Sequence, residues 1–171
     1  MVVAEFIAEA YAESSQLLPK RAEDRAVMRL FIELCGSTFS YFPLLRAEED
    51  KDFDIALKTL KEGLVNTDAF LKHSHPDGPF LLGDKFTLAE CTVAPFVQRC
   101  CTILPAFTGK SKSSRKPVDP LDLCDELGLI RLRKWIEAVN SRPSVKASEV
   151  SANGMIESTT RMLERFAAMK K

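Results

Sequence analysis

The sequence has no surplus of charge of either sign. Its 171 residues include 24 basic and 24 acidic residues, which gives a formal net charge of zero. Proteins that bind nucleic acid need an excess of basic residues, because each phosphate contact must neutralise a negative charge. The balance therefore excludes a broadly nucleic-acid-binding surface, and we expect no nucleic-acid partner.

Long uninterrupted apolar runs are also missing. The most apolar stretch, residues 86–104, contains Glu90, Pro95 and Arg99, whereas a membrane-spanning helix needs about 20 apolar residues in a row. The first five residues lack the basic segment with which a secretory signal begins. We therefore expect no membrane partner and a cytoplasmic location.

Metal-binding and disulfide patterns are lacking as well. The five cysteines are odd in number and include no CxxC spacing. Small buried thiols in a reducing compartment are the simpler interpretation, and a redox pair formed by Cys100 and Cys101 is the alternative. His73 and His75 precede a turn rich in proline and glycine, with no third ligand in view. The sequence therefore predicts no metal site.

What the sequence does contain is helical periodicity. Apolar residues recur every three or four positions, and no six-residue stretch alternates in the manner of a strand. Gly36 and Pro43 predict a bend or an early end in the second helix. Residues 105–120 are polar and basic, which predicts a solvated loop or, alternatively, a docking site for an acidic partner. The predicted helices cover residues 2–11, 21–46, 53–71, 87–104, 121–140 and 155–169.

The clearest local signal begins at Thr87. This residue is a predicted N-cap, and Glu90 lies three residues on, where its carboxylate can reach back to the Thr87 amide in a capping box. A helix that is apolar on all sides is buried, and Pro95 should kink it. We therefore predict an all-α bundle packed around this buried central helix. The apolar positions that follow the cap are Val93, Ala94, Phe96, Val97, Cys100, Ile103 and Leu104.

Three motifs, in order along the chain, resemble those of cytosolic glutathione S-transferases. Residues 5–26 contain EFIAEAY, LLP and DRA, and they are similar to the junction between the two domains of that family. Residues 81–90, LLGDKFTLAE, resemble the start of the family's central helix, with Glu90 in place of the usual aspartate. Residues 135–145, WIEAVNSRPSV, resemble the end of a later helix. Residues 95–99, PFVQR, are most similar to the omega class.

The resemblance implies a two-part organisation. Residues 16–171 correspond to the C-terminal helical domain of a glutathione transferase, and residues 1–15 to the last helix of a thioredoxin-like domain that is otherwise absent from this chain. Glutathione is implied as the co-substrate of the complete enzyme, for conjugation or thiol transfer. Ionising its thiol requires a positioned donor, and no recognisable donor motif is present. We therefore predict no catalytic residue here, an inactive isolated chain and no tight binding of glutathione.

The resemblance also implies a role for the helical half in binding the second substrate. In the family this half supplies the wall of the pocket for a small hydrophobic or thiol-reactive substrate, and the matching positions are Phe39, Phe42 and Arg99. Arg99 is a cation on an otherwise apolar helix, suited to an anionic substrate or to a glutathione carboxylate. The alternatives are an ion pair with an acidic residue for Arg99 and ordinary packing for both phenylalanines.

Two main functions remain open at this stage. The chain is either a piece of a glutathione transferase or a non-catalytic docking module of the kind found in translation elongation factor and aminoacyl-tRNA synthetase complexes. A small-molecule carrier is a third possibility. The first function predicts a bare apolar face at Val2, Phe6 and Ile7, because these residues would pack against the absent sheet. The second predicts a polar or covered surface. We expect a homodimer, or another association through the face of residues 2–11.

Overall fold

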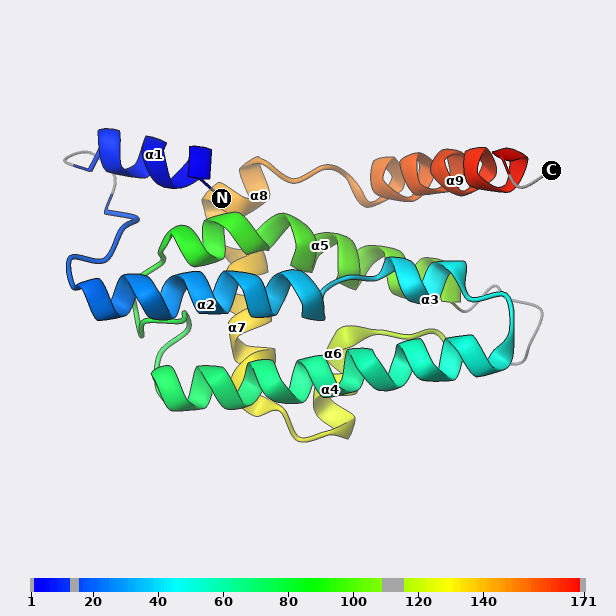
Figure 1. Ribbon diagram of the computed structural model, residues 1–171, viewed down its shortest axis with the longest axis horizontal. Helices are drawn as coiled ribbons and strands as arrows, with labels where there is room; N and C mark the ends of the chain where they lie inside the picture. The colour runs from blue at the N-terminus through cyan, green and yellow to red at the C-terminus, as the bar shows by residue number, and fades with distance from the viewer. Residues whose placement is uncertain (1, 13–15, 109–115, 170–171) are drawn as a thin grey trace.

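Every regular element in the computed structural model is helical within the residues that it describes, 2–12, 16–108 and 116–169 (Figure 1). Two isolated bridges, Phe80 to Gly83 and Leu82 to Lys85, form a tight turn rather than a strand. The predicted all-α fold class is therefore confirmed. The helices are α1 (Val2–Ala10), α2 (Ala22–Thr38), α3 (Phe42–Arg46), α4 (Asp50–Ser74), α5 (Leu88–Thr108), α6 (Pro120–Glu126), α7 (Ile130–Ser141), α8 (Pro143–Ala147) and α9 (Ala152–Met169).

Helix α5 is the central element of the bundle. It contacts α1, α2, α3, α6, α7 and α9, and residues such as Val97, Cys100 and Leu104 have no exposed surface. The prediction of burial on all sides is only partly right. Pro95, Phe96 and Arg99 lie on an exposed side of the helix, and the Phe96 side chain is 45% exposed. Hydrophobic composition identified the central helix, but not the side that other helices leave open.

Two predicted helices are each interrupted. The helix predicted over 21–46 ends at Thr38, and α3 begins at Phe42, with Pro43 in its first turn, where the missing N–H of proline costs nothing. The helix predicted over 121–140 breaks between α6 and α7 at Gly128, whose φ of +67° is a conformation that favours glycine. Each break follows from the chemistry of a single residue, Pro43 in the first case and Gly128 in the second.

The C-terminal end of α5 extends further than predicted. The helix passes through Pro105 and ends at Thr108. The Thr108 hydroxyl donates a hydrogen bond to the Leu104 carbonyl at 2.6 Å and accepts one from the Val118 amide at 2.8 Å. This side chain therefore ties the returning chain to the helix end. Residues 109–115 of the predicted basic loop lie outside the described residues, and residues 116–119 lead into α6 without regular structure.

The start of α7 is capped by a residue of another helix. Its own N-cap residue, Leu129, has no side chain that can accept a hydrogen bond. Asp68 of α4, only 3% exposed, accepts the Leu132 N–H at 2.9 Å through Oδ1. Its other oxygen lies 2.7 Å from the Lys72 ammonium. A buried carboxylate at the positive end of a helix dipole is stabilised in this way, and it fixes α7 against α4.

Helices α1 and α9 lie on the same side of the bundle, over opposite ends of α5 (Figure 1). Helix α1 is attached through Ala8, which is 3% exposed, and through Glu5, which accepts a 2.8 Å hydrogen bond from Arg29 Nε of α2. Its large apolar residues are exposed: Val2 is 81% exposed, Val3 72%, Phe6 67% and Ile7 51%. Tyr11, which follows the helix, is 64% exposed.

None of the described helices is long and apolar enough to cross a membrane.

Candidate functional site

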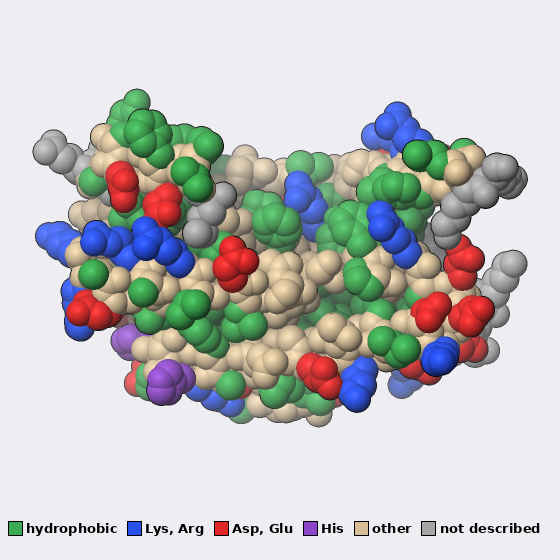
Figure 2. Space-filling view, in the orientation of Figure 1, with side chains coloured by type: hydrophobic (Ala, Val, Ile, Leu, Met, Phe, Trp, Pro, Cys, Tyr) green, Lys and Arg blue, Asp and Glu red, His purple; other side chains and the backbone are tan. Residues whose placement is uncertain are grey.

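The surface of the molecule is hollowed between α1 and α9. Figure 2 shows these two helices rising at opposite ends of the bundle, with hydrophobic and basic side chains in the hollow between them. The exposed side of α5 includes Phe96 and Arg99. An apolar surface that also carries a cation suits a ligand that is partly apolar and partly anionic. We take this hollow as the candidate functional site.

Phe42 is the first residue of α3. Its partly buried ring stacks on Tyr41 with the ring centroids 4.6 Å apart. The Arg46 guanidinium carbon lies 5.5 Å from the Phe42 centroid and 4.5 Å from the Phe166 centroid of α9. Arg46 thus lies between two aromatic rings, in cation–π contact with both. It connects α3, at one side of the site, to α9.

Arg99 has no acidic partner among the described residues. It is exposed on α5 and forms neither an ion pair nor a hydrogen bond with any of them. Its charge still acts on Tyr41: burial raises the pKa of this phenol, and the Arg99 guanidinium opposes that rise by favouring the phenolate. The structural pairing that was the alternative interpretation is therefore not present in the described part of the chain, and the cation is open to a ligand.

Phe39 lies inside the core and not at the open surface. Its side chain is 1% exposed, and its ring stacks on Trp135 with the centroids 6.3 Å apart. The residue follows directly after α2, and its N–H donates to the Cys35 carbonyl at 2.9 Å. Of the three residues predicted to bind substrate, Arg99 is exposed, Phe42 is partly buried, and Phe39 lies in the core, where its ring can only pack.

Thr87 and Glu90 form the hydrogen bonds of a capping box at the start of α5. The Thr87 N–H donates to Glu90 Oε2 at 2.9 Å, and the Thr87 hydroxyl donates to the same oxygen at 2.8 Å. The Ala89 N–H in turn donates to the Thr87 hydroxyl at 3.3 Å. The other Glu90 oxygen accepts the Leu81 N–H at 2.7 Å and the Trp135 Nε1–H at 3.2 Å. These residues hold the helix that carries the site and do not face it.

Three of the five cysteines are poor nucleophiles because they are buried, whereas Cys91 is exposed on α5. Cys35 and Cys100 are completely buried, and desolvation raises the pKa of both thiols well above the ordinary value. Burial also raises the pKa of Cys101 to about 12. Such thiols are protonated and unreactive at neutral pH. Within the described residues there is no group of three or more His, Cys, Asp or Glu side chains arranged to hold a metal ion.

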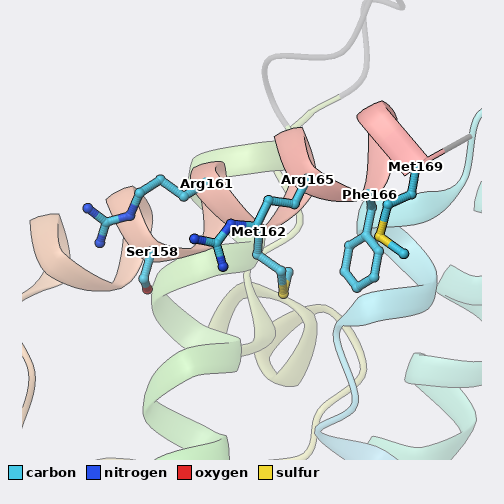
Figure 3. Close-up of a pocket in the computed structure, with 6 residues that line it drawn as sticks. All are labelled: Ser158, Arg161, Met162, Arg165, Phe166 and Met169. Atoms are coloured by element: carbon cyan, nitrogen blue, oxygen red, sulfur yellow. The ribbon is translucent and has the colours of Figure 1, made fainter. Parts of the chain in front are cut away.

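Sequence reasoning missed a second group of residues, on α9. A groove of about 700 Å³ runs along this helix (Figure 3). The sequence predicted only a helix over residues 155–169 and assigned it no site, yet Phe166 is 40% exposed and Met169 82% exposed. The available signal was the pair of arginines four residues apart beside that stripe. The lining residues are Ser158, Arg161, Met162, Arg165, Phe166 and Met169.

The fold resembles those of solved glutathione transferases. The omega 3C enzyme from Trametes versicolor is 23% identical, with a TM-score of 0.67 over 88% of this chain and 61% of its own. A tau-class enzyme from mango, Mangifera indica, is 17% identical, with a TM-score of 0.70 over 93% and 68%. The Leishmania protein TDR1, described as a trimeric glutathione transferase, is 20% identical, with a TM-score of 0.64 over 90% and 32%.

This chain therefore spans less than two thirds of the length of the Trametes and Leishmania proteins. A search of curated proteins found no significant match. The sequence model described as "Glutathione S-transferase, C-terminal domain" matches residues 47–138, more than half of the 171 residues. That segment runs from the end of α3 through α4, α5 and α6 into α7, and so includes the central helix. The chain belongs to the glutathione S-transferase family and carries its C-terminal helical domain.

Proposed function

We propose that this chain is the helical half of a glutathione-dependent transferase and supplies the wall of its second-substrate site. In this proposal residues 1–15 are the last helix of a thioredoxin-like domain, and that domain provides the glutathione site and the catalytic group. The reaction is glutathione conjugation or thiol transfer on a small hydrophobic or thiol-reactive substrate, in the cytoplasm. Membership of the glutathione transferase family supports the reaction class.

The observation that carries the proposal is the bare face of α1. Phe6 is 67% exposed, and Val2 and Ile7 are 81% and 51% exposed on the same short helix. Contiguous apolar surface of this kind seldom stays uncovered in a functional monomer. A sheet packed on α1 would cover it. A self-sufficient docking module would instead present polar residues there, so the exposure favours the transferase over the docking function.

The placement of Phe42 and Arg99 supports the substrate role. A covering domain seated on α1 would lie next to the hollow, and a substrate held between the two halves would meet the exposed side of α5. Arg99 offers a guanidinium group without an internal partner, which is suited to a carboxylate of the substrate or of glutathione. The adjacent Phe96, 45% exposed, offers apolar contact.

The direct test is the activity of the isolated chain. We expect no conjugation of a chromogenic electrophile such as 1-chloro-2,4-dinitrobenzene, no reduction of a glutathione mixed disulfide, and no retention on immobilised glutathione. The reason is that the chain carries no recognisable motif that would ionise the glutathione thiol. A complete glutathione transferase assayed in parallel is the control. Glutathione-dependent turnover by the chain alone, above the uncatalysed rate, would contradict the proposal that another domain provides the glutathione site and the catalytic group.

A further inference from the structure

Tyr41 carries a hydroxyl group that the described part of the chain leaves unused. The residue is 8% exposed, and its hydroxyl forms no hydrogen bond with a described residue. The Tyr41 oxygen is not fully enclosed, so it reaches the surface although the ring is buried. Within the described residues, the polar side-chain atoms that are both enclosed and without a partner belong to Thr92, Gln98, Arg131 and Asn140.

Packing holds the Tyr41 ring in place. The ring stacks on Phe42, with the centroids 4.6 Å apart and the planes inclined by 30°. Tyr41 is also the N-cap residue of α3, and this short helix contacts both α4 and α5. A buried, stacked ring has little freedom to turn, so its hydroxyl is held in one direction. A ligand that uses such a hydroxyl pays little of the entropy of ordering it.

Arg99 and Cys100 of α5 are the neighbours of this phenol. Burial raises the pKa of Tyr41 above its ordinary value, the Arg99 guanidinium opposes the rise, and the Cys100 thiol adds to it. The phenol therefore keeps its proton at neutral pH. The positive charge of Arg99 attracts the hydroxyl oxygen and repels its proton. The hydroxyl is accordingly oriented to donate a hydrogen bond away from Arg99.

The surface next to this donor is apolar. Phe96 lies four residues before Cys100, so the two side chains share one side of α5, and Phe96 is 45% exposed. An ionised oxygen would lose much of its hydration on entering such surroundings, which costs far more than burying an uncharged carbonyl that is hydrogen-bonded. The donor and its surroundings therefore suit an apolar compound with a carbonyl oxygen.

We propose that Tyr41 is a specificity-determining residue of the substrate site, whose hydroxyl donates a hydrogen bond to the carbonyl oxygen of an apolar ketone or aldehyde. The apolar body of that compound packs against Phe96. A compound without the carbonyl displaces water from the hydroxyl and offers no acceptor in its place, so it binds more weakly. This inference rests on the proposed function, because it names the class of second substrate and the residue that selects it.

The test uses two fluorescent naphthalenes that differ in a single carbonyl group. Prodan, 6-propionyl-2-dimethylaminonaphthalene, carries a ketone, and the 6-propyl analogue has a methylene group in its place. We expect Tyr41→Phe to bind prodan about fivefold more weakly, the loss expected for one hydrogen bond. Its affinity for the propyl analogue should stay within about twofold. Bound prodan should also emit at a shorter wavelength in this variant, because its carbonyl no longer accepts a hydrogen bond.

Tyr11→Phe is the matched control, because Tyr11 is the second of the two tyrosines and is 64% exposed. This control should bind both probes as the unchanged chain does. Equal weakening of both probes by Tyr41→Phe would assign Tyr41 to packing alone and overturn the proposal. Unchanged prodan binding in that variant, or no saturable prodan binding by the unchanged chain, would overturn it as well. Circular dichroism checks that each variant is folded.

Ultraviolet absorbance of the phenolate tests the placement of Arg99 separately. In the Tyr11→Phe background Tyr41 is the remaining tyrosine, and Arg99→Gln should raise its pKa, because the lost cation favoured the phenolate. An unchanged pKa would contradict the orientation argued for the hydroxyl. Neither measurement uses glutathione. Turnover by the isolated chain would therefore contradict the proposed function and leave the probe results standing, whereas failure of the probe tests would contradict the role of Tyr41 alone.

Discussion

Glu90 has no exposed surface, and its two carboxylate oxygens each accept two hydrogen bonds. A buried carboxylate is tolerated only when donors surround it in this way. The donors come from the turn before α5, from the capping residue Thr87 and from Trp135 of α7. The capping box could be predicted from the spacing of Thr87 and Glu90. The bonds to Leu81 and Trp135 could not, because they depend on the tertiary arrangement of elements far apart in the sequence.

We predict that Glu90→Gln lowers the free energy of unfolding by about 1–3 kcal/mol, the usual cost of leaving buried hydrogen-bonding groups unsatisfied. Glutamine has the same shape as glutamate, but its NH₂ group replaces one of the two oxygens. That group cannot accept hydrogen bonds, so the two bonds to the replaced oxygen are lost. The measurement is a urea denaturation curve. Glu157→Gln, at an exposed position of α9, is the matched control and should leave the midpoint almost unchanged. Equal stability of the two variants would refute the role given to Glu90.

At the scale of the elements, the existence of most helices could be predicted from apolar periodicity, and their ends often could not. The break at Gly128 was missed because the pattern continues across it from Leu123 to Leu132. The open side of α5 was missed because Phe96 is as apolar as its buried neighbours. Leu30 fits the apolar periodicity of α2 and is nevertheless 61% exposed. Periodicity identifies a face that can be buried, and only the packing of other elements decides whether it is.

Replacing glycine with alanine should have opposite effects on stability at two positions, one between α6 and α7 and one inside α2. At Gly128, φ is +67° and a Cβ would meet nothing within 4 Å. Gly128→Ala should therefore destabilise the fold by about 1 kcal/mol through backbone conformation alone. Gly36 lies inside α2 and also has open space around it. Gly36→Ala should stabilise the fold by about 0.5–1 kcal/mol. Thermal denaturation of both variants is the measurement, and a shift in the same direction would contradict the argument.

At the scale of the whole molecule, the fold class and the central position of α5 were correctly predicted, whereas the substrate role of the three predicted residues stays a prediction. Arg99 is exposed and Phe42 partly buried, but Phe39 is part of the core beside Trp135. The distinction could not be made from the sequence, because aromatic residues near a helix end are equally suited to a pocket wall and to packing. The groove on α9 was absent from the prediction, since an apolar stripe normally indicates burial.

The bare face of α1 predicts self-association of the isolated chain. Phe6 is 67% exposed and central to that face, so burying it against a second copy removes apolar surface from water. We expect light scattering at micromolar concentration to show dimers or larger species, and Phe6→Ser to shift them toward monomer. Ile130→Ser is the control, because Ile130 is 78% exposed at the start of α7. If the chain without substitutions is monomeric, the prediction of self-association is wrong, and the proposal that a further domain covers α1 is weakened too.

The two halves of α9 have different attachments to the body of the protein. The two buried residues of this helix, Met155 and Thr159, both lie in its first half, whereas the exposed Phe166 and Met169 lie in the second. The second half should therefore fray at a much lower free energy than the bundle unfolds. Backbone amides in the second half of α9 should therefore exchange with solvent deuterium faster than those in its first half, while the rest of the bundle stays folded.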